Sequence, residues 1–168
     1  MKPTLLITIL LSLLFSCSTL TDNSKNTTAL AKLSDSLPMV NTGNVMLVKQ
    51  LFRIDENGKN LIIEQPIFDF DSIPSGHSQF NLIPIGEIEP STLRVIEDGE
   101  KVGLMIDCKK NSLGFLISPE LSEKRNKENT VDWFYLGGYP KSQTETLEKI
   151  KQEIFILIKQ HELKKSTR

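Results

Sequence analysis

The pattern that constrains this chain most is an apolar stripe near its carboxyl terminus. Aliphatic side chains recur there at helical spacing, among Lys, Glu and Gln residues. The run from Ser142 to Glu145 has the form of a capping box that begins a helix. A helix with a single apolar face needs another surface to cover, so the rest of the chain must supply one. The stripe consists of Leu147, Ile150, Ile154, Leu157, Ile158 and His161.

Two β-hairpins in the middle of the chain are expected to supply that surface. Residues 47–54 alternate in type and lead through Asn57 and Gly58 into a second apolar run at 61–63. An Asn-Gly pair between two such runs supplies the positive φ angles of a tight hairpin turn. Residues 93–97 and 101–108 flank Asp98-Gly99 in the same way. The second hairpin is expected to point Val102, Leu104, Ile106 and Cys108 into the core.

The remaining segments predict shorter elements. Four prolines between residues 65 and 90 lack the backbone donor of a sheet, so only short or edge strands are expected there. Another strand pair is expected at 113–117 and 131–136, with a short helix between them, and one or two helical turns at 29–37. The sequence therefore predicts an α+β fold: an antiparallel β-sheet of about five to seven strands with the C-terminal amphipathic helix packed on one face.

The amino terminus has the arrangement of a secretory signal. Lys2 precedes an apolar run from Leu5 to Phe15, which is about half of the ~20 residues that a helix needs to cross a bilayer. The sequence Leu-Phe-Ser-Cys then ends at Cys17 and resembles the lipobox of bacterial lipoproteins. The resemblance implies that the Cys17 thiol receives a diacylglyceryl group, that cleavage occurs before it, and that the new amino terminus is acylated. An ordinary secretory signal is the alternative.

The same resemblance divides the chain into three parts. Residues 1–16 are the expected signal peptide, 17–43 the lipidated cysteine with a flexible tether, and 44–168 a single α+β domain. Two or three fatty chains, such as palmitate, anchor a protein firmly to a membrane. Ser18 after the cysteine implies the outer membrane, with the domain facing the periplasm.

The composition of the chain limits the classes of molecule that it can bind. The chain has 20 basic and 21 acidic residues, and neither sign is concentrated over a long stretch. We therefore expect no nucleic acid as partner, because phosphate binding needs a basic surface. Besides Cys17 the chain has Cys108, which its predicted core position assigns to packing rather than to a reactive thiol. No cofactor is expected.

Two segments suit recognition of another protein. Residues 120–129 are rich in charged side chains and are expected to project from a hairpin end, while aromatic residues cluster from 133 to 139. Trp and Tyr are favoured anchors at protein interfaces. A solvated loop and a core strand are the alternatives for these segments. The predicted partner-binding residues are Glu120, Glu123, Lys124, Arg125, Lys127, Trp133, Tyr135 and Tyr139.

Three functional hypotheses follow. The first is a non-enzymatic, lipid-anchored envelope protein that binds another protein, for example an inhibitor or immunity protein against a toxin delivered into the periplasm. The alternative is a small-molecule or metal-binding lipoprotein, because Asp69, Asp71 and His77 supply ligand types that divalent ions accept. A hydrolase that depends on Asp69 or Ser78 ranks last.

Overall fold

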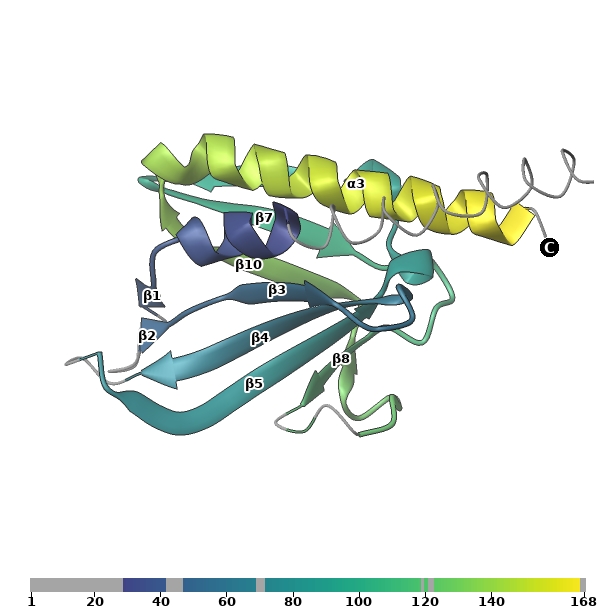
Figure 1. Cartoon of the computed structure of the whole chain (residues 1–168), viewed down its shortest axis with the longest axis horizontal. Coiled ribbons are helices and arrows are strands. Elements are labelled where there is room, and N and C mark those ends of the chain that lie inside the picture. Colours follow the sequence, from purple (N-terminus) through teal and green to yellow (C-terminus); the bar gives the residue numbers. More distant parts are fainter. Residues whose placement is uncertain (1–28, 42–46, 69–71, 119, 121–122, 167–168) are drawn as a thin grey trace, which may run out of the picture.

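The computed structural model describes residues 29–41, 47–68, 72–118, 120 and 123–166. Its strands form two antiparallel sheets, and the helix α3 (Thr144–Ser166) covers one of them (Figure 1), which confirms the predicted α+β class. The strands are β1 (Val40–Asn41), β2 (Leu47–Val48), β3 (Leu51–Ile54), β4 (Asn60–Phe68), β5 (Pro74–Pro84), β6 (Arg94–Asp98), β7 (Lys101–Asp107), β8 (Phe115–Ser118), β9 (Thr130–Val131) and β10 (Trp133–Pro140). Two 3-10 turns, η1 (Ile85–Glu87) and η2 (Pro90–Thr92), lie between β5 and β6, and a further one, η3 (Lys141–Gln143), joins β10 to α3.

The two sheets divide the chain unequally. Within the described residues, one sheet contains seven strands in the order β1-β2-β4-β5-β8-β9, with β3 also paired to β4. The other sheet contains three strands in the order β10-β7-β6. The strand β8 pairs with β5 only at residues 80–82, so residues 74–79 of β5 have a described strand partner on one side alone.

Both predicted hairpins form. The strands β3 and β4 pair from Leu51 to Ile54, and Gly58 in their turn has a φ of 65°. The Asp55 carboxylate fixes this turn, because its Oδ1 accepts the backbone N–H groups of Lys59 and Asn60 at 2.7 and 3.0 Å. The strands β6 and β7 pair in the same manner across a two-residue turn. Local turn chemistry is therefore sufficient to specify both pairings.

The strands β4 and β5 are longer than the proline content predicts, so the expectation of short strands is wrong, whereas the alternative of an edge strand holds for residues 74–79 of β5. Pro66 lies where β4 passes from β3 to β2, and the register with β5 shifts between Pro66 and Phe68. Pro74 and Pro84 occupy the two ends of β5. Each proline thus stands at an irregularity or a strand end, where the missing donor does no harm.

The predicted strand pair near residue 131 forms only in part. Phe115 and Leu116 of β8 pair with Val131 and Thr130, but the chain then leaves this sheet, and β10 pairs with β7 instead. Asp132 is the one residue between β9 and β10, where the chain changes sheets. The short helix expected between the strands does not extend over residues 123–126, and residues 119, 121 and 122 lie outside the described part.

The helix α3 buries the stripe that its sequence predicts. The five aliphatic side chains of the stripe are between 0 and 6% exposed and share one core with β7, where Val102, Leu104 and Ile106 are each 0% exposed. His161 packs against the turn η1, because a Cβ on Gly86 would lie 2.6 Å from its Cε1. The place of His161 near the end of the stripe predicts packing or compensation of the helix dipole, and this contact bears out the packing role.

The core also includes the segment before residue 44. Residues 29–36 are helical, as predicted, and Leu30, Leu37 and Val40 are 0, 1 and 5% exposed in the same core. Ser34 ties this helix to β3, since its Oγ accepts the Phe52 N–H at 3.0 Å. The packed part of the chain therefore begins by residue 29, and the predicted end of the tether at residue 43 is too late.

Shortening a side chain of the buried stripe tests the role of α3. We expect Ile154→Ala to lower the free energy of unfolding by about 2–4 kcal/mol, because it removes buried methyl groups and leaves a cavity. Ile156→Ala on the same helix is the matched control, because Ile156 is 40% exposed and its loss should cost less than about 1 kcal/mol. Urea unfolding followed by circular dichroism measures both, and equal losses would contradict the assignment.

Candidate interaction site

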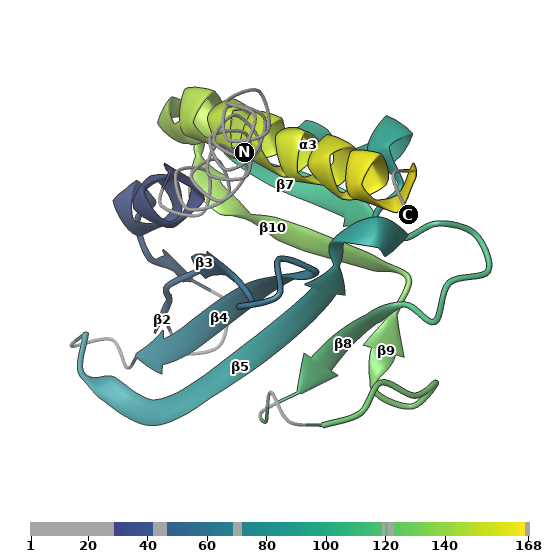
Figure 2. The same ribbon diagram turned by 45° about the vertical axis from the view of Figure 1, so that its right-hand side comes forward.

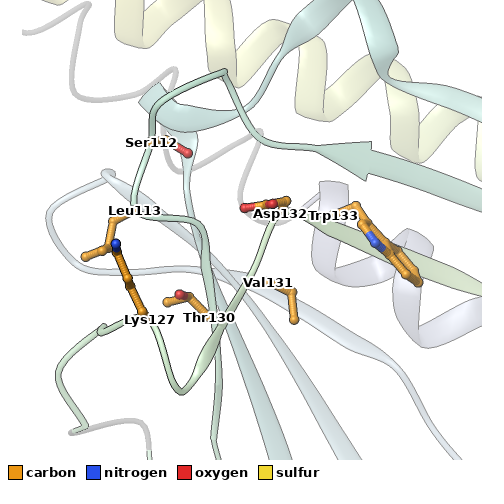
Figure 3. Close-up of a pocket in the computed structure, with 7 residues that line it drawn as sticks. All are labelled: Ser112, Leu113, Lys127, Thr130, Val131, Asp132 and Trp133. Carbon is orange, nitrogen blue, oxygen red and sulfur yellow. The ribbon is translucent and has the colours of Figure 1, made fainter.

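A shallow pocket of about 480 Å³ opens where the β7–β8 connection meets β9 and the start of β10 (Figure 3). Polar and charged side chains share its lining with two aliphatic residues and an indole. The pocket lies beside the loop between β8 and β9, which carries most of the predicted partner-binding residues. The lining consists of Ser112, Leu113, Lys127, Thr130, Val131, Asp132 and Trp133.

Close backbone packing positions the two walls of this pocket. The Cys108 N–H donates to the Asp132 carbonyl at 2.8 Å and joins the end of β7 to the β9–β10 link. Gly114 has a φ of 93°, and a Cβ at this position would lie 2.8 Å from the Val131 carbonyl oxygen. Only glycine adopts this positive φ readily and lets the backbone come this close to Val131. Gly114 therefore sets the spacing between the two pocket walls.

Ser112 contributes a buried hydroxyl to the pocket wall. Its N–H donates to the Lys109 carbonyl at 3.1 Å, which closes the turn. Its Oγ is buried and has no hydrogen-bond partner among the described residues. A buried hydroxyl without a partner costs about 1–3 kcal/mol. A polar group that entered the pocket could satisfy it.

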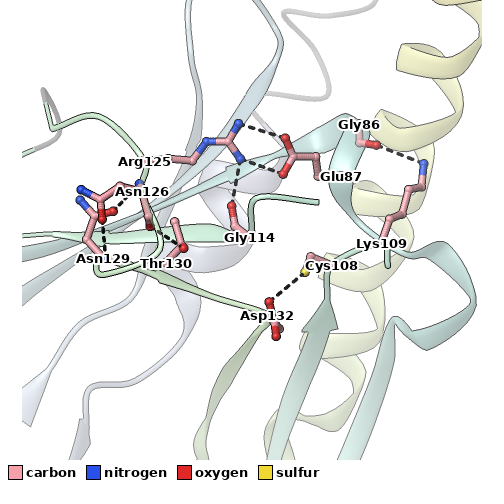
Figure 4. Close-up of polar contacts among 10 residues, drawn as sticks. All are labelled: Gly86, Glu87, Cys108, Lys109, Gly114, Arg125, Asn126, Asn129, Thr130 and Asp132. Atoms are coloured by element: carbon pink, nitrogen blue, oxygen red, sulfur yellow. Dashed lines mark hydrogen bonds and ion pairs between the residues drawn. The ribbon is translucent and has the colours of Figure 1, made fainter. Parts of the chain in front are cut away.

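Cys108 and Asp132 lie next to this wall, where their side chains approach each other (Figure 4), and both line a second pocket of about 380 Å³. The Cys108 Sγ lies 3.9 Å from the Asp132 Oδ1, so the thiol donates a weak hydrogen bond to the carboxylate. Cys108 is only partly buried, although it packs against the core as predicted. Glu89 at the same pocket accepts hydrogen bonds from the Ser91 hydroxyl and N–H, and these bonds lower the pKa of its carboxyl.

Arg125 fixes the loop between β8 and β9 to the body of the protein. Its guanidinium donates to both carboxylate oxygens of Glu87 at 2.8 and 2.9 Å and to the Gly114 carbonyl at 2.9 Å (Figure 4). The Arg125 and Glu87 side chains are 24 and 27% exposed. A two-pronged contact of this kind restricts geometry more than a single ion pair does. Arg125, which the sequence predicts to bind a partner, therefore makes its described contacts within the protein.

A network of asparagine side chains orders the same loop. The Asn126 Oδ1 accepts the N–H groups of Glu128 and Asn129, and the Asn129 Oδ1 accepts the Asn126 N–H at 2.8 Å. Thr130 closes the network, since its hydroxyl donates to the Asn126 carbonyl at 2.6 Å. Side chains of this type mimic backbone turns. The described part of the loop is therefore ordered in the free protein.

The aromatic residues of β10 do not form the single cluster that their proximity predicts. Trp133 is 57% exposed at the pocket rim, whereas Tyr139 is fully buried and donates its hydroxyl hydrogen to the Gln50 side chain. Burial raises the pKa of Tyr139 above its usual range. The β-bulge after Leu136 is the cause: one extra residue in β10 turns Tyr139 to the same face as Leu136.

Tyr135 takes an intermediate position on the outer face of the three-stranded sheet. Its ring covers two glycines, because a Cβ on Gly103 or on Gly137 would lie 2.4 or 2.1 Å from it. Burial of this ring, followed by the nearby charge of Asp98, raises the pKa of Tyr135. Tyr135 and Trp133 lie on the same face of β10, which is the face opposite the core.

The other predicted residues have diverse surroundings. Glu120, Glu123 and Lys124 are exposed, and Glu123 accepts a 3.3 Å hydrogen bond from Asn129. Lys127 is exposed and lines the pocket. For the predicted metal site, His77 is exposed on β5, and Asp69 and Asp71 lie outside the described residues.

Sequence reasoning did not identify the residues that complete the pocket. Ser112, Leu113 and Asp132 come from two chain segments that meet only because β8 pairs with β9. Glu87, the partner of Arg125, lies 38 residues away in the chain. The one local signal that could have identified Asp132 is its position directly before Trp133.

The contact between Arg125 and Glu87 gives a direct test of loop order. We expect Arg125→Lys to speed hydrogen exchange of the amides in residues 123–130 by roughly tenfold, because lysine cannot replace the two-pronged contact and about 1–2 kcal/mol of local stability is lost. Lys124→Gln is the matched control, because Lys124 is exposed. Mass spectrometry of exchanged peptides measures both, and unchanged exchange in Arg125→Lys would contradict the role.

Within residues 29–41, 47–68, 72–118, 120 and 123–166, no three His, Cys, Asp or Glu side chains gather closely enough to hold a metal ion. Over the same residues, no helix combines the length and the apolar character that a membrane crossing requires. Comparison of the chain with protein-family models, with curated proteins and with solved structures gives no match.

Proposed function

We propose that this chain is a lipid-anchored protein of the bacterial envelope whose folded domain is non-catalytic and binds another protein. The observation that carries the proposal is Trp133, which is 57% exposed at the rim of an ordered pocket. A large exposed aromatic side chain on a rigid frame is typical of an interface anchor. The pocket and the pinned loop together form the proposed recognition surface.

The order of this surface supports binding of a protein rather than a merely solvated loop. Arg125 and the network of Asn126, Asn129 and Thr130 restrain the loop in the free protein. A surface that is already ordered loses less conformational entropy when a partner binds. Lys127 and Asp132 place opposite charges around the pocket, so a complementary partner presents both signs.

The lipid anchor rests on the resemblance of residues 14–17 to a lipobox. With acyl chains on Cys17, the domain is held at a membrane, and Ser18 favours the outer membrane with the domain in the periplasm. A binding domain held there suits a protective role, such as inhibition of or immunity to a toxin that enters the periplasm. Such a role requires binding alone and no catalytic residue.

A second candidate function has one specific observation in its favour. The buried Ser112 Oγ at the pocket wall has no described hydrogen-bond partner, so a small polar molecule could supply one. The chain would then be a lipoprotein that binds a small molecule. We rank protein binding first, because Trp133 exposes more of its side chain than contact with a small ligand would cover.

Truncation of the indole tests the protein-binding function. We expect Trp133→Ala to weaken capture of the partner from solubilised envelope membranes by about 30-fold or more, the effect of losing an interface anchor worth at least 2 kcal/mol. Ile156→Ala removes an exposed apolar side chain from α3 and should leave capture unchanged. A partner that binds both variants equally, or no captured protein at physiological salt, would count against this function.

The anchor has a separate test. We expect the mass of the mature protein to show cleavage before Cys17 and fatty acylation of that residue. Cys17→Ser should release the protein from the membrane fraction, because a single reversible contact cannot replace two or three acyl chains. Membranes washed at high salt provide the control, since only electrostatically held protein leaves them. An unmodified Cys17 in mature, membrane-retained protein would refute the anchor.

A further inference from the structure

The strand β6 forms an open edge of the three-stranded sheet. Among the described strands it pairs with β7 alone, and this register runs without a break from Arg94 to Asp98. Helix α3 runs alongside β7 and β10 in both views (Figures 1 and 2) and packs against the inner face of the sheet, where Leu104 and Ile106 are buried. The edge of β6 is therefore regular over its whole length, although no described strand continues the sheet there.

The pairing with β7 leaves one set of β6 backbone groups without a described strand partner. Alternate residues of an antiparallel strand bond to the same neighbour. Asp107 of β7 bonds on the side of β6, since its carbonyl accepts the Glu89 N–H at 2.9 Å. The other odd-numbered residues of β7 therefore bond to the even-numbered residues of β6 that lie opposite them. The N–H and C=O groups of Val95 and Glu97 then face away from β7.

This edge lacks the features that close the open edge of β5. Residues 74–79 of β5 begin with a proline, and Gly76 there has a left-handed φ of 79°. Prolines, bulges and charged side chains keep edge strands from pairing with other strands. The β6 sequence Arg-Val-Ile-Glu-Asp contains no proline or glycine, and its register with β7 has no bulge. The pattern of its charges therefore decides which strand can pair with β6.

That pattern is complementary to a second β6 strand. Arg94 and Asp98 lie two residues before and two residues after Ile96. In an antiparallel pair centred on Ile96, each Arg94 lies opposite Asp98 of the second copy, and the two Ile96 side chains lie opposite each other. Opposed pairs of unlike charges and of apolar side chains both stabilise a sheet. The same centre places Val95 opposite Glu97 of the second copy, so their outward N–H and C=O groups can bond.

The side chains that would meet are available at the edge. The Arg94 side chain is 52% exposed, and its guanidinium donates to the Thr92 carbonyl at 2.9 Å and lies 3.5 Å from the Asp107 carboxylate. A guanidinium has several donors, so these contacts leave others for a second carboxylate. Asp98 is exposed, and none of the described residues donates a hydrogen bond to its carboxylate or forms an ion pair with it. Ile96 is only partly buried.

We propose that two copies of this chain pair in antiparallel orientation through β6, with Ile96 on the twofold axis. Their three-stranded sheets then form one continuous sheet. Such an isologous contact uses the same surface on both copies, so it closes as a dimer and does not continue into a fibre. The recognition surface stays accessible, because Trp133 begins β10 at the opposite edge of the sheet. The inference goes beyond the proposed function and does not depend on acylation of Cys17.

A disulfide at position 96 tests the pairing. Opposed residues of a non-hydrogen-bonded antiparallel pair have Cα atoms about 4.5 Å apart, within the range of about 4.4 to 6.8 Å that a disulfide spans. In the full chain with Cys17→Ser and Cys108→Ser, Ile96→Cys supplies the single thiol, because the natural sequence has two cysteines. Ile156→Cys in the same background is the matched control, because Ile156 is 40% exposed on α3.

The purified proteins are oxidised in mild detergent at micromolar concentration and separated on a non-reducing gel. We expect Ile96→Cys to form linked dimers at least about fivefold faster than Ile156→Cys, because pairing raises the effective concentration of the opposed thiols. The control thiols meet only by random collision. Equal rates at the two positions would overturn the inference.

Charge reversal tests the register. Arg94→Asp or Asp98→Arg, added to the Ile96→Cys protein, places like charges opposite each other, and each should slow linkage about fivefold or more. A mixture of the two variants, one of them tagged, should restore linkage as mixed dimers, because every Asp then lies opposite an Arg. The double variant with both reversals should restore it within one chain type.

Circular dichroism verifies that each charge variant is folded. Linkage that either reversal leaves unchanged, or that neither the mixture nor the double variant restores, would overturn the inference. If a reversal prevents folding, the comparison of positions 96 and 156 decides the inference alone.

Discussion

The fold depends on burial of one helical stripe. The five aliphatic residues of α3 meet the inner face of β7, and the same continuous core reaches Leu61 and Ile63 of β4 and Leu30 of the first helix. Among the described strands, each pairs only within its own sheet, so side-chain packing in the shared core holds the two sheets together. Burial of apolar surface is non-directional, so the exact register of each sheet must come from other sources.

Those sources explain what the sequence could and could not predict. The two hairpins and the carboxyl-terminal helix were predictable because their signals are local: Gly58 and Gly99 in turns, and apolar spacing along α3. The length of β4 was not predictable, because Pro66 is tolerated only through a shift in pairing with β5. Helical turns near residue 30 were predicted, but their place in the core depends on distant contacts such as Ser34 with Phe52.

The candidate site was predicted less completely than the fold, for a similar reason. Trp133 and Lys127 were identified from residue type, and both line the pocket. A bulge near Gly137 turned Tyr139 into the core, and no local signal distinguishes that bulge from a regular strand. Arg125 was identified as a surface charge, yet its guanidinium is occupied by a carboxylate 38 residues away. Pairing between distant residues decides whether a charge is available to a partner.

Residues 74–79 of β5, which have a described strand partner on one side alone, matter when many copies of this protein lie close together on one surface. Between Pro74 and Gln79, backbone groups of β5 face outward without a described neighbouring strand. Open strand margins invite aggregation by continued sheet growth. Here a proline begins the margin, Gly76 adopts a left-handed φ of 79°, and the exposed side chains are serine and histidine. These features discourage edge-to-edge stacking at this margin, so densely packed copies can remain separate there.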